Sequence, residues 1–404
     1  MTTSDPPSPR IEEWRSNWLV VVGSALGIAT GMGVFSFVSS QFILPLQAEF
    51  GWSRTSQSLA LNAQILAGLL APAFGLLVDR FGARAIAAAC FPLVAATYFG
   101  LAAMPNSLAA FYGLMLALPM FGMGTAGIVF SRAVLACFNQ SRGLALAASR
   151  LGVAVAGVLL PIMCYGTIAR FGWRGGYVLL GLLALLVGWP ATRLLRRRGV
   201  SRGGNVSLSG FVQLLRNRHV LILCGAVSLT LGPIVGIIGQ LQPILSGKGL
   251  ALQAAAALGG VLAASIFAGT ILTGALIDRV WAPLIGCLFT IAAACGCLML
   301  SAETLSVNWA IAALALIGLG QGAEIDLAGF MIARYLGIEQ LAAIFGITIT
   351  AISIASALCG IAVAACYDHL ATYDPALIAG AGLLVVAAIL YLAMGRYPEP
   401  ELEK

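Results

Sequence analysis

The chain has 404 residues, of which 60% are hydrophobic and only 9% are charged, and its mean hydropathy is +0.98. A soluble domain carries about 25% charged residues, so this chain lacks the polar side chains needed to cover a surface in water. The composition excludes a soluble globular protein and indicates an integral membrane protein.

Twelve apolar runs recur along the chain, each close to the roughly 20 residues that a transmembrane helix needs. The first run is too long for the core of a signal peptide, and no small-residue cleavage site follows it, so we expect it to be retained. The runs lie near residues 17–42, 57–79, 84–104, 108–133, 143–166, 175–196, 219–244, 252–277, 282–302, 307–333, 339–366 and 375–396.

Lys and Arg are distributed unevenly between these runs. With the N-terminus inside, the inner segments hold seventeen of the 22 basic residues, and the outer loops hold Arg54, Arg170, Arg174 and Lys248. Cytoplasmic loops of membrane proteins are enriched in Lys and Arg, so both termini are predicted to be cytoplasmic. The net charge of +7 is then a topology signal, and we expect a multi-pass protein of the bacterial inner membrane with no nucleic-acid partner.

A polar stretch rich in Arg, Gly and Ser divides the runs into six and six. We expect a cytoplasmic tail at 1–16, a six-helix bundle at 17–196, a linker at 197–218, a second bundle at 219–396 and a tail at 397–404. Such repeated halves are typical of transporters in which one central site is exposed alternately to each side of the membrane.

Short motifs recur in the same order in both halves. GLLVDR at 75–80 corresponds to GALIDR at 274–279, and GMGTAG at 122–127 corresponds to GLGQGA at 318–323. The two halves therefore read as copies of one six-helix unit.

The stretch GLLVDRFGAR at 75–84 resembles the signature loop of the major facilitator superfamily, between its second and third helices. The resemblance implies an all-α membrane fold with twelve transmembrane helices in two pseudo-symmetric bundles. It also implies that Asp79 closes an inner gate against the other half, while Gly82 supplies a tight turn. We expect a functional monomer in the lipid bilayer, with no cofactor and no metal. The gate candidates are Gly75, Asp79, Arg80, Gly82, Arg84, Arg132, Asp278 and Arg279.

Further stretches resemble the bacterial branch that includes monocarboxylate and oxalate–formate carriers. In that branch, substrates are small organic acids moved with protons or by exchange against a counter-anion. The eighth helix of those carriers supplies a carboxylate-binding arginine, whereas run 252–277 of this chain has no basic residue. The stretches are FGWSR at 50–54, RGLALA at 142–147, FGWRGGY at 171–177, GAEIDL at 322–327, ARYLG at 333–337 and YDHLATY at 367–373.

Arg150 is the arginine that could replace the missing one. It lies about two turns into the fifth run, and most of its helical neighbours are small residues, which favours packing against a helix or lining a cavity. A guanidinium group matches a carboxylate bidentately and stays charged, which suits anion recognition. A salt bridge at a gate and snorkelling to the interface are the alternatives.

Glu324 and Asp326 stand two positions apart in the tenth run, where each charge costs roughly 2.5–3.5 kcal/mol. Residues two apart point about 200° from each other on a helix, so the two carboxylates serve different faces. We expect Glu324, on the side of Gln321, to face the cavity and carry a proton, and Asp326 to pair with Arg150 or Arg132. The two roles could be exchanged, or both carboxylates could be bridged to arginines and never titrate.

Polar side chains in two other runs are further candidates for substrate contact. Asn62 and Gln64 lie in the second run, and Gln240 and Gln242 follow the glycine-rich stretch GPIVGIIG in the seventh, which we expect to bend. Amide groups can bind the hydroxyl or carboxyl groups of a solute.

Three classes of function are compatible with a polytopic membrane protein. The sequence favours a secondary active transporter of a small organic anion, coupled to protons or working by exchange. An exporter of drug-like amphiphiles or a carrier of an uncharged solute is the alternative. A membrane enzyme is disfavoured, because the sequence has no HExxH, GxSxG, P-loop or metal-spaced His/Cys motif.

Overall fold

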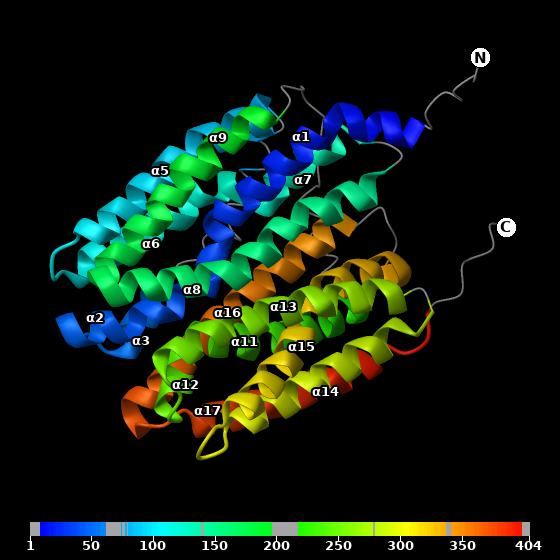
Figure 1. Cartoon of the computed structure of the whole chain (residues 1–404). Helices are drawn as coiled ribbons and strands as arrows, with labels where there is room; N and C mark the ends of the chain where they lie inside the picture. Colours follow the sequence, from blue (N-terminus) through cyan, green and yellow to red (C-terminus); the bar gives the residue numbers. More distant parts are fainter. Residues whose placement is uncertain are drawn as a thin grey trace. The chain divides into compact units, whose positions relative to one another are not determined.

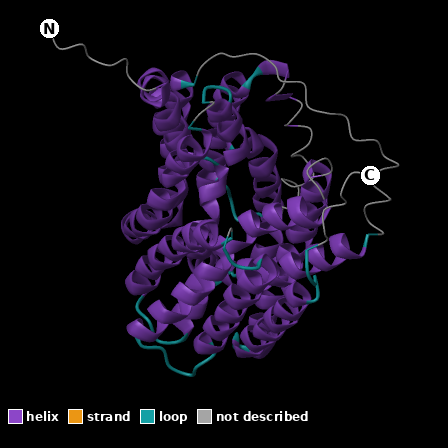
Figure 2. Ribbon diagram, turned by 90° about the vertical axis from the view of Figure 1, so that its right-hand side faces the viewer, coloured by secondary structure: helices purple, strands orange, loops and turns teal. Residues whose placement is uncertain are grey.

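The computed structural model describes residues 9–61, 74, 77–78, 80–138, 141–195, 217–277, 279–336 and 341–397. These residues form helices joined by short loops, and no strand occurs among them (Figure 2). The contacts between residues group the chain into two compact units. The first consists of Met1–Val38 and Leu69–Gly203, and the second of Ser39–Gly68 and Gly204–Lys404.

Nine helices in the described part are long and apolar enough to cross a membrane. They cover the third to the twelfth of the expected runs, because the span Leu144–Leu194 contains the fifth and the sixth. The helix in that span kinks at Gly172, whose φ of 70° is a left-handed conformation that favours glycine. Most of the second run lies outside the described residues. The fold is therefore all-helical and consistent with twelve spans.

Large apolar side chains point away from the protein along many of these helices. Leu288, Leu358 and Ile389 are each more than half exposed although they lie within membrane-length helices. In water such surface would promote aggregation, whereas in a bilayer it contacts lipid. The exposed surface fits the membrane environment expected from composition.

The first unit contains two spans that are interrupted at mid-length. Met32 begins the 3-10 turn after α1, and its N–H donates to Thr125 Oγ1 at 3.0 Å. Thr125 lies in the 3-10 turn between α6 and α7. The two interruptions thus pack against each other. Met123–Thr125 is buried, whereas the turn at Met32–Phe37 is buried in part and exposes Gly33. Irregular backbone in a membrane is tolerated where it is buried or lines a cavity. The elements are α1 (Pro9–Thr30), η1 (Met32–Phe37), α5 (Ala83–Ala103), α6 (Leu108–Gly122), η4 (Met123–Thr125), α7 (Gly127–Leu135), α8 (Arg142–Leu183), η5 (Ala184–Gly188), α9 (Trp189–Ala191) and η6 (Thr192–Leu194).

The second unit pairs its long helices closely: α11 with α16, α13 with α15, and α14 with both α15 and α17 (Figure 1). A short segment from before the linker belongs to it, because α3 packs against α16. In sequence this segment lies within the expected first bundle, 17–196, whereas its contacts place Ser39–Gly68 in the second unit. The elements are η2 (Ser39–Phe42), α2 (Ile43–Phe50), α3 (Arg54–Leu61), α11 (Arg218–Gly239), α12 (Leu241–Gly247), α13 (Leu252–Leu276), α14 (Ala282–Leu300), α15 (Val307–Leu336), α16 (Leu341–Leu370) and α17 (Asp374–Leu392).

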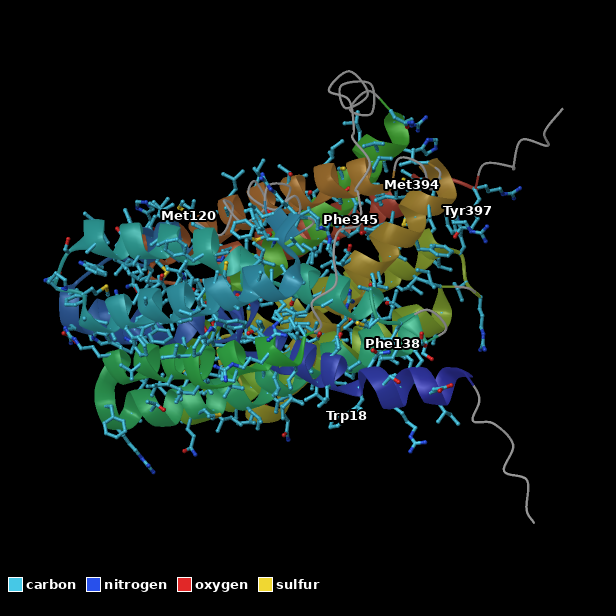
Figure 3. The ribbon with its side chains drawn as sticks, turned by 90° about the horizontal axis from the view of Figure 1, so that it is seen from above. Trp18, Met120, Phe138, Phe345, Met394 and Tyr397 are labelled. Carbon is cyan, nitrogen blue, oxygen red and sulfur yellow. The ribbon has the colours of Figure 1, made fainter. Side chains whose placement is uncertain are left out.

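Aromatic side chains near the two chain termini pack against neighbouring helices of their own unit. Met394 and Tyr397 follow α17 (Figure 3), and Tyr397 accepts a 2.9 Å hydrogen bond from the backbone N–H of Ala282 at the start of α14. In the first unit, Phe138 packs edge-on against Trp14 of α1, with ring centroids 5.1 Å apart.

Candidate functional site

Glu324 is fully buried, with 0% of its surface exposed, near the middle of α15. Tyr391 of α17 donates a hydrogen bond to Oε2, and Thr290 of α14 donates to Oε1 at 3.4 Å. The hydroxyl of Thr230 in α11 lies 3.4 Å from that of Thr290 and donates to the Ala226 carbonyl. Hydroxyl groups from three helices therefore surround one carboxyl group.

No ion pair to Glu324 occurs among the residues that the structure describes. A buried carboxyl group must be satisfied by hydrogen bonds or by an opposite charge. Hydroxyl groups can both donate and accept, so this environment can hydrogen-bond the carboxylate and also the protonated acid. We name Glu324, Tyr391, Thr290 and Thr230 the carboxyl–hydroxyl cluster.

The contacts of Glu324 lie within the second unit, and its orientation toward the central cavity remains a prediction. Its hydrogen bonds run to α14 and α17 and extend to α11, which places the carboxyl group inside the second unit. The opposite packing surface of α15 carries Gly318 and Gly322, which pack against α13. The four-helix environment could not be read from the spacing within one helix.

Asp326 lies on another face of α15, as the 200° separation predicted. Its side chain is partly exposed whereas that of Glu324 is buried, so the prediction of two separate faces is confirmed. Gln321 is also partly buried, and its Oε1 has no hydrogen-bond partner in the part of the chain that the structure describes.

The predicted arginine partners both belong to the first unit. Arg150 is exposed on α8, and Gly152, half a turn away, packs directly on the backbone of Ala25 in α1. A Cβ at Gly152 would stand 2.1 Å from the Ala25 carbonyl oxygen. Arg132 is partly buried in the last turn of α7. Pairing of either arginine with Asp326 remains a prediction.

Gln240 occupies the break between α11 and α12 in the seventh span. The bend expected there is present, and the helix is interrupted directly after Gly239. Gln240 is 1% exposed, donates from Nε2 to Ser58 Oγ at 2.8 Å, and accepts at Oε1 from the Tyr373 hydroxyl at 3.0 Å. Gln242 is also buried, and its Oε1 has no partner among the described residues.

Arg54 is a buried charge that sequence reasoning assigned only to an outer loop. It is 6% exposed at the start of α3, and its guanidinium lies 3.5 Å from the centroid of the Tyr367 ring. Nη1 donates to the Tyr373 hydroxyl at 2.5 Å, and Nε donates to Gln47 Oε1 at 3.2 Å. Arg54 of the motif FGWSR therefore contacts Tyr367 and Tyr373 of the motif YDHLATY.

The loop after the second span is described only in part. Gly82 has a φ of 83° and donates its N–H to the Val78 carbonyl at 2.8 Å, so the predicted tight turn is confirmed. Arg84 donates to the Leu195 carbonyl at 3.4 Å, which holds the start of α5 against the end of the sixth span. Arg80 and Arg279 are exposed. The remaining candidates Asn62, Gln64, Gly75, Asp79 and Asp278 lie outside the described residues.

A helical fold with paired membrane-length helices and a carboxyl group enclosed within one unit is typical of polytopic transport proteins. The sequence model of the Major Facilitator Superfamily matches residues 21–358, and the chain belongs to that family. It is a membrane transporter of this superfamily.

A curated relative and several solved structures are similar to this chain. The "MFS transporter asaE" of Aspergillus flavus is 27% identical over 252 residues, covering 58% of this chain and 53% of the relative, about half its length. The nucleoside transporter NupG has a TM-score of 0.76 at 14% identity, covering 95% of this chain and 99% of its own. A bacterial homologue of the human lysosomal transporter Spinster has a TM-score of 0.70 at 17% identity, covering 96% and 98%. At these identities the solved structures support the fold alone.

Proposed function

We propose that the protein is a secondary active transporter that moves a small organic anion by alternating access and couples it to protons. The observation that carries the proposal is Glu324, a fully buried carboxyl group contacted by neutral hydroxyl donors. Proton relays of transporters are built from such intramembrane carboxyl groups.

The carboxyl–hydroxyl cluster suits a proton site because it offers partners to both protonation states. When Glu324 is ionised, Tyr391 and Thr290 donate to its two oxygens. When it is protonated, its O–H can donate to a hydroxyl oxygen of the same cluster. No arginine or lysine has to move for the proton to bind or leave. Proton coupling, rather than exchange against a counter-anion, therefore becomes the leading form of the proposal.

Arg150 is the proposed contact for the substrate carboxylate. It is an exposed cation on α8, which packs closely on α1 at Gly152, two residues away, so the backbone that carries Arg150 is held in place. A guanidinium group keeps its charge and binds a carboxylate through two parallel hydrogen bonds. Gln321 and Gln242, which have unpaired acceptor atoms in the described structure, are further contacts in this proposal.

The proposal is tested by uptake of labelled small carboxylates into proteoliposomes with an imposed pH gradient. We expect gradient-driven accumulation by the wild type, loss of all carboxylate transport in Arg150→Ala, and exchange without accumulation in Glu324→Gln. Arg170→Ala and Glu303→Gln remove exposed charges elsewhere and should behave like the wild type. Absence of carboxylate transport under every gradient would contradict the proposal.

A carrier of an uncharged, hydroxyl-rich solute is the second candidate. The amide oxygens of Gln57 and Gln242 are buried and have no hydrogen-bond partner in the described part of the chain. Such acceptors suit solute hydroxyl groups, and one structural neighbour, NupG, is a nucleoside transporter. Uptake of labelled nucleosides into the same vesicles distinguishes the anion carrier from the carrier of an uncharged solute. If the protein carries an uncharged solute, Gln242→Leu should reduce nucleoside uptake at least tenfold.

The remaining assignments follow the same proposal. Asp79, Arg80 and Arg84 would close the inner gate with Arg132, Asp278 and Arg279. We place the transporter in the bacterial inner membrane as a monomer with both termini in the cytoplasm, since the Lys and Arg distribution favours that orientation.

A further inference from the structure

The buried face of α3 carries polar side chains, whereas its outward face carries an apolar one. Arg54, Gln57 and Ser58 are 6%, 1% and 4% exposed, while Leu59 is 47% exposed. Residues three and four positions apart lie on the same side of a helix, so the three polar side chains form one buried surface. In a membrane protein, a charged group that faces inward either pairs with another group or marks a site for a solute or ion.

Polar groups of the α11–α12 break and of the turn before α17 contact this surface. Gln240 Nε2 donates to Ser58 Oγ at 2.8 Å, and the hydroxyl of Tyr373 donates to Gln240 Oε1 at 3.0 Å. Both Gln240 and Tyr373 are buried. We name Arg54, Gln57, Ser58, Gln240 and Tyr373 the α3 polar cluster, and all five residues belong to the second unit.

The guanidinium group of Arg54 is only partly used by its neighbours. Nε donates to Gln47 Oε1, Nη1 donates to the Tyr373 hydroxyl, and the plane of the group stacks on Tyr367. All of these partners are neutral, and Nη2 has no hydrogen-bond partner in the part of the chain that the structure describes. Nη2 is not among the enclosed polar atoms that lack a partner, so it retains access to solvent and a small ligand can reach it.

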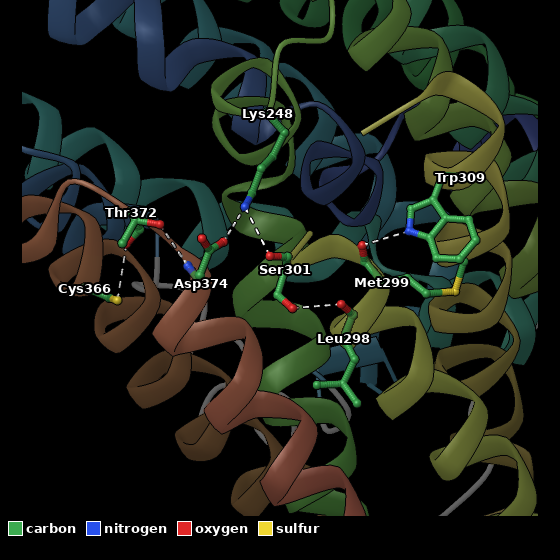
Figure 4. Close-up of polar contacts among 8 residues, drawn as sticks. All are labelled: Lys248, Leu298, Met299, Ser301, Trp309, Cys366, Thr372 and Asp374. Carbon is green, nitrogen blue, oxygen red and sulfur yellow. Dashed lines mark hydrogen bonds and ion pairs between the residues drawn. The ribbon is translucent and has the colours of Figure 1, made fainter. Parts of the chain in front are cut away.

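The carboxylate groups beside the cluster are engaged elsewhere. The two oxygens of Asp368 accept from the backbone N–H groups of Arg54 at 3.2 Å and Thr55 at 2.8 Å, where they cap the start of α3. Asp374 at the start of α17 pairs with Lys248 (Figure 4). No ion pair to the Arg54 guanidinium occurs among the described residues. A buried charge without a counter-charge is costly, so the cluster is suited to receive an anion.

Gln57 adds an unused hydrogen-bond acceptor one helical turn from Arg54. Its Nε2 donates to the Trp52 carbonyl at 3.4 Å, whereas its Oε1 is enclosed and has no partner among the described residues. Buried polar atoms nearly always have a partner in the protein, in ordered water or in a ligand, and a free amide oxygen suits a hydroxyl donor. A cation and an acceptor on the same face of one helix match a carboxylate and a hydroxyl group on one small molecule.

We propose that the α3 polar cluster is a binding site for a small hydroxycarboxylate, with the carboxylate on Nη2 of Arg54 and the hydroxyl group on Oε1 of Gln57. A guanidinium group stays charged and forms strong, charge-assisted hydrogen bonds to a carboxylate. The inference rests on the proposed function only in taking an organic anion as the ligand. It adds a second anion site, because Arg150 belongs to the first unit whereas the cluster belongs to the second.

The site is tested by isothermal titration calorimetry of the full-length Arg150→Ala protein in detergent, which lacks the substrate contact proposed above. The probes are lactate, propionate, which lacks the hydroxyl group of lactate, and sulfate, which is a tetrahedral anion. Each further substitution is added to Arg150→Ala. Arg54→Gln removes the cation, Arg54→Lys keeps the charge but loses the planar fork of donors, and Gln57→Leu removes the acceptor. Arg170→Ala, which removes an exposed arginine, is the matched control. Thermal unfolding without ligand identifies any variant that does not fold.

We expect lactate to bind at least tenfold more tightly than propionate or sulfate, because a site that hydrogen-bonds a ligand hydroxyl discriminates against a ligand without it. Arg54→Gln should abolish the binding of both acids, and Arg54→Lys should weaken it about tenfold. Gln57→Leu should lower the affinity for lactate to that for propionate, and Arg170→Ala should change nothing. Absence of lactate binding, equal affinities for the three probes, or an unchanged affinity in Arg54→Lys would overturn the site.

This inference and the proposed function fail separately. If the wild type transported no carboxylate, binding of lactate by the Arg150→Ala protein would still stand. If the Arg150→Ala protein bound no lactate, carboxylate transport that depends on Arg150 would be unaffected.

Discussion

Glu324 is the residue whose chemistry depends most on its neighbours. Its spacing from Asp326 correctly predicted two faces, but its hydroxyl partners come from positions 34 and 67 residues away in the chain. Thr290 and Tyr391 have no feature in the sequence that marks them, because threonine and tyrosine are ordinary residues of apolar helices. Long-range partners of a buried carboxyl group could therefore be found only from the fold.

Tyr391→Phe should destabilise the protein by about 1–3 kcal/mol, because it leaves a buried carboxyl oxygen without its donor. Thermal unfolding of purified protein in detergent measures the change. Tyr112→Phe removes the hydroxyl of a partly buried tyrosine that makes no hydrogen bond among the described residues, and it should have little effect. Equal shifts in the two variants would argue against a structural role for the Tyr391–Glu324 bond.

The same logic applies to Arg54, which the sequence placed in a loop. The motifs FGWSR and YDHLATY are separate stretches of the sequence, and they come into contact because α3 packs against α16. Arg150, by contrast, was identified by its position in an apolar run, and its role as substrate contact remains a prediction.

At the scale of elements, α15 is defined by glycines on the side that meets α13. A Cβ at Gly322 would stand 1.9 Å from the Ile266 carbonyl oxygen, and one at Gly318 would stand 2.8 Å from that of Leu262. Small residues four apart let two membrane helices approach closely. The GLGQGA motif is a repeat in the sequence, and the structure explains its glycines as a packing surface.

Gly322→Ala should separate α13 and α15 and destabilise the protein, since the added methyl group meets backbone that cannot rotate away. We expect a cost of about 1–3 kcal/mol, the usual range for overpacking a well-packed interior. Gly274→Ala in α13 is the matched control, because open space surrounds its Cβ position and alanine favours the helix by about 1 kcal/mol. Thermal unfolding measures both changes. If Gly274→Ala unfolded at a lower temperature than Gly322→Ala, the result would contradict this account of the α13–α15 interface.

At the scale of the whole molecule, hydropathy and charge predicted an all-helical membrane protein, and the fold and the family match confirm it. The runs were readable because a lipid environment requires about 20 apolar residues per span. The breaks within the first and fourth spans were not predicted, since buried packing of irregular backbone depends on residues far apart in sequence. Membership of Ser39–Gly68 in the second unit depends on long-range contacts for the same reason.

The proton role of Glu324 is tested most directly by measuring proton movement itself. Proteoliposomes containing a trapped pH-sensitive dye would receive a transported carboxylate outside, with no pH gradient imposed. We predict internal acidification with the wild type and with Glu303→Gln, and none with Glu324→Gln, although Glu324→Gln still exchanges labelled solute. Acidification by Glu324→Gln at the wild-type rate would contradict the proposal and move the coupling proton to another group.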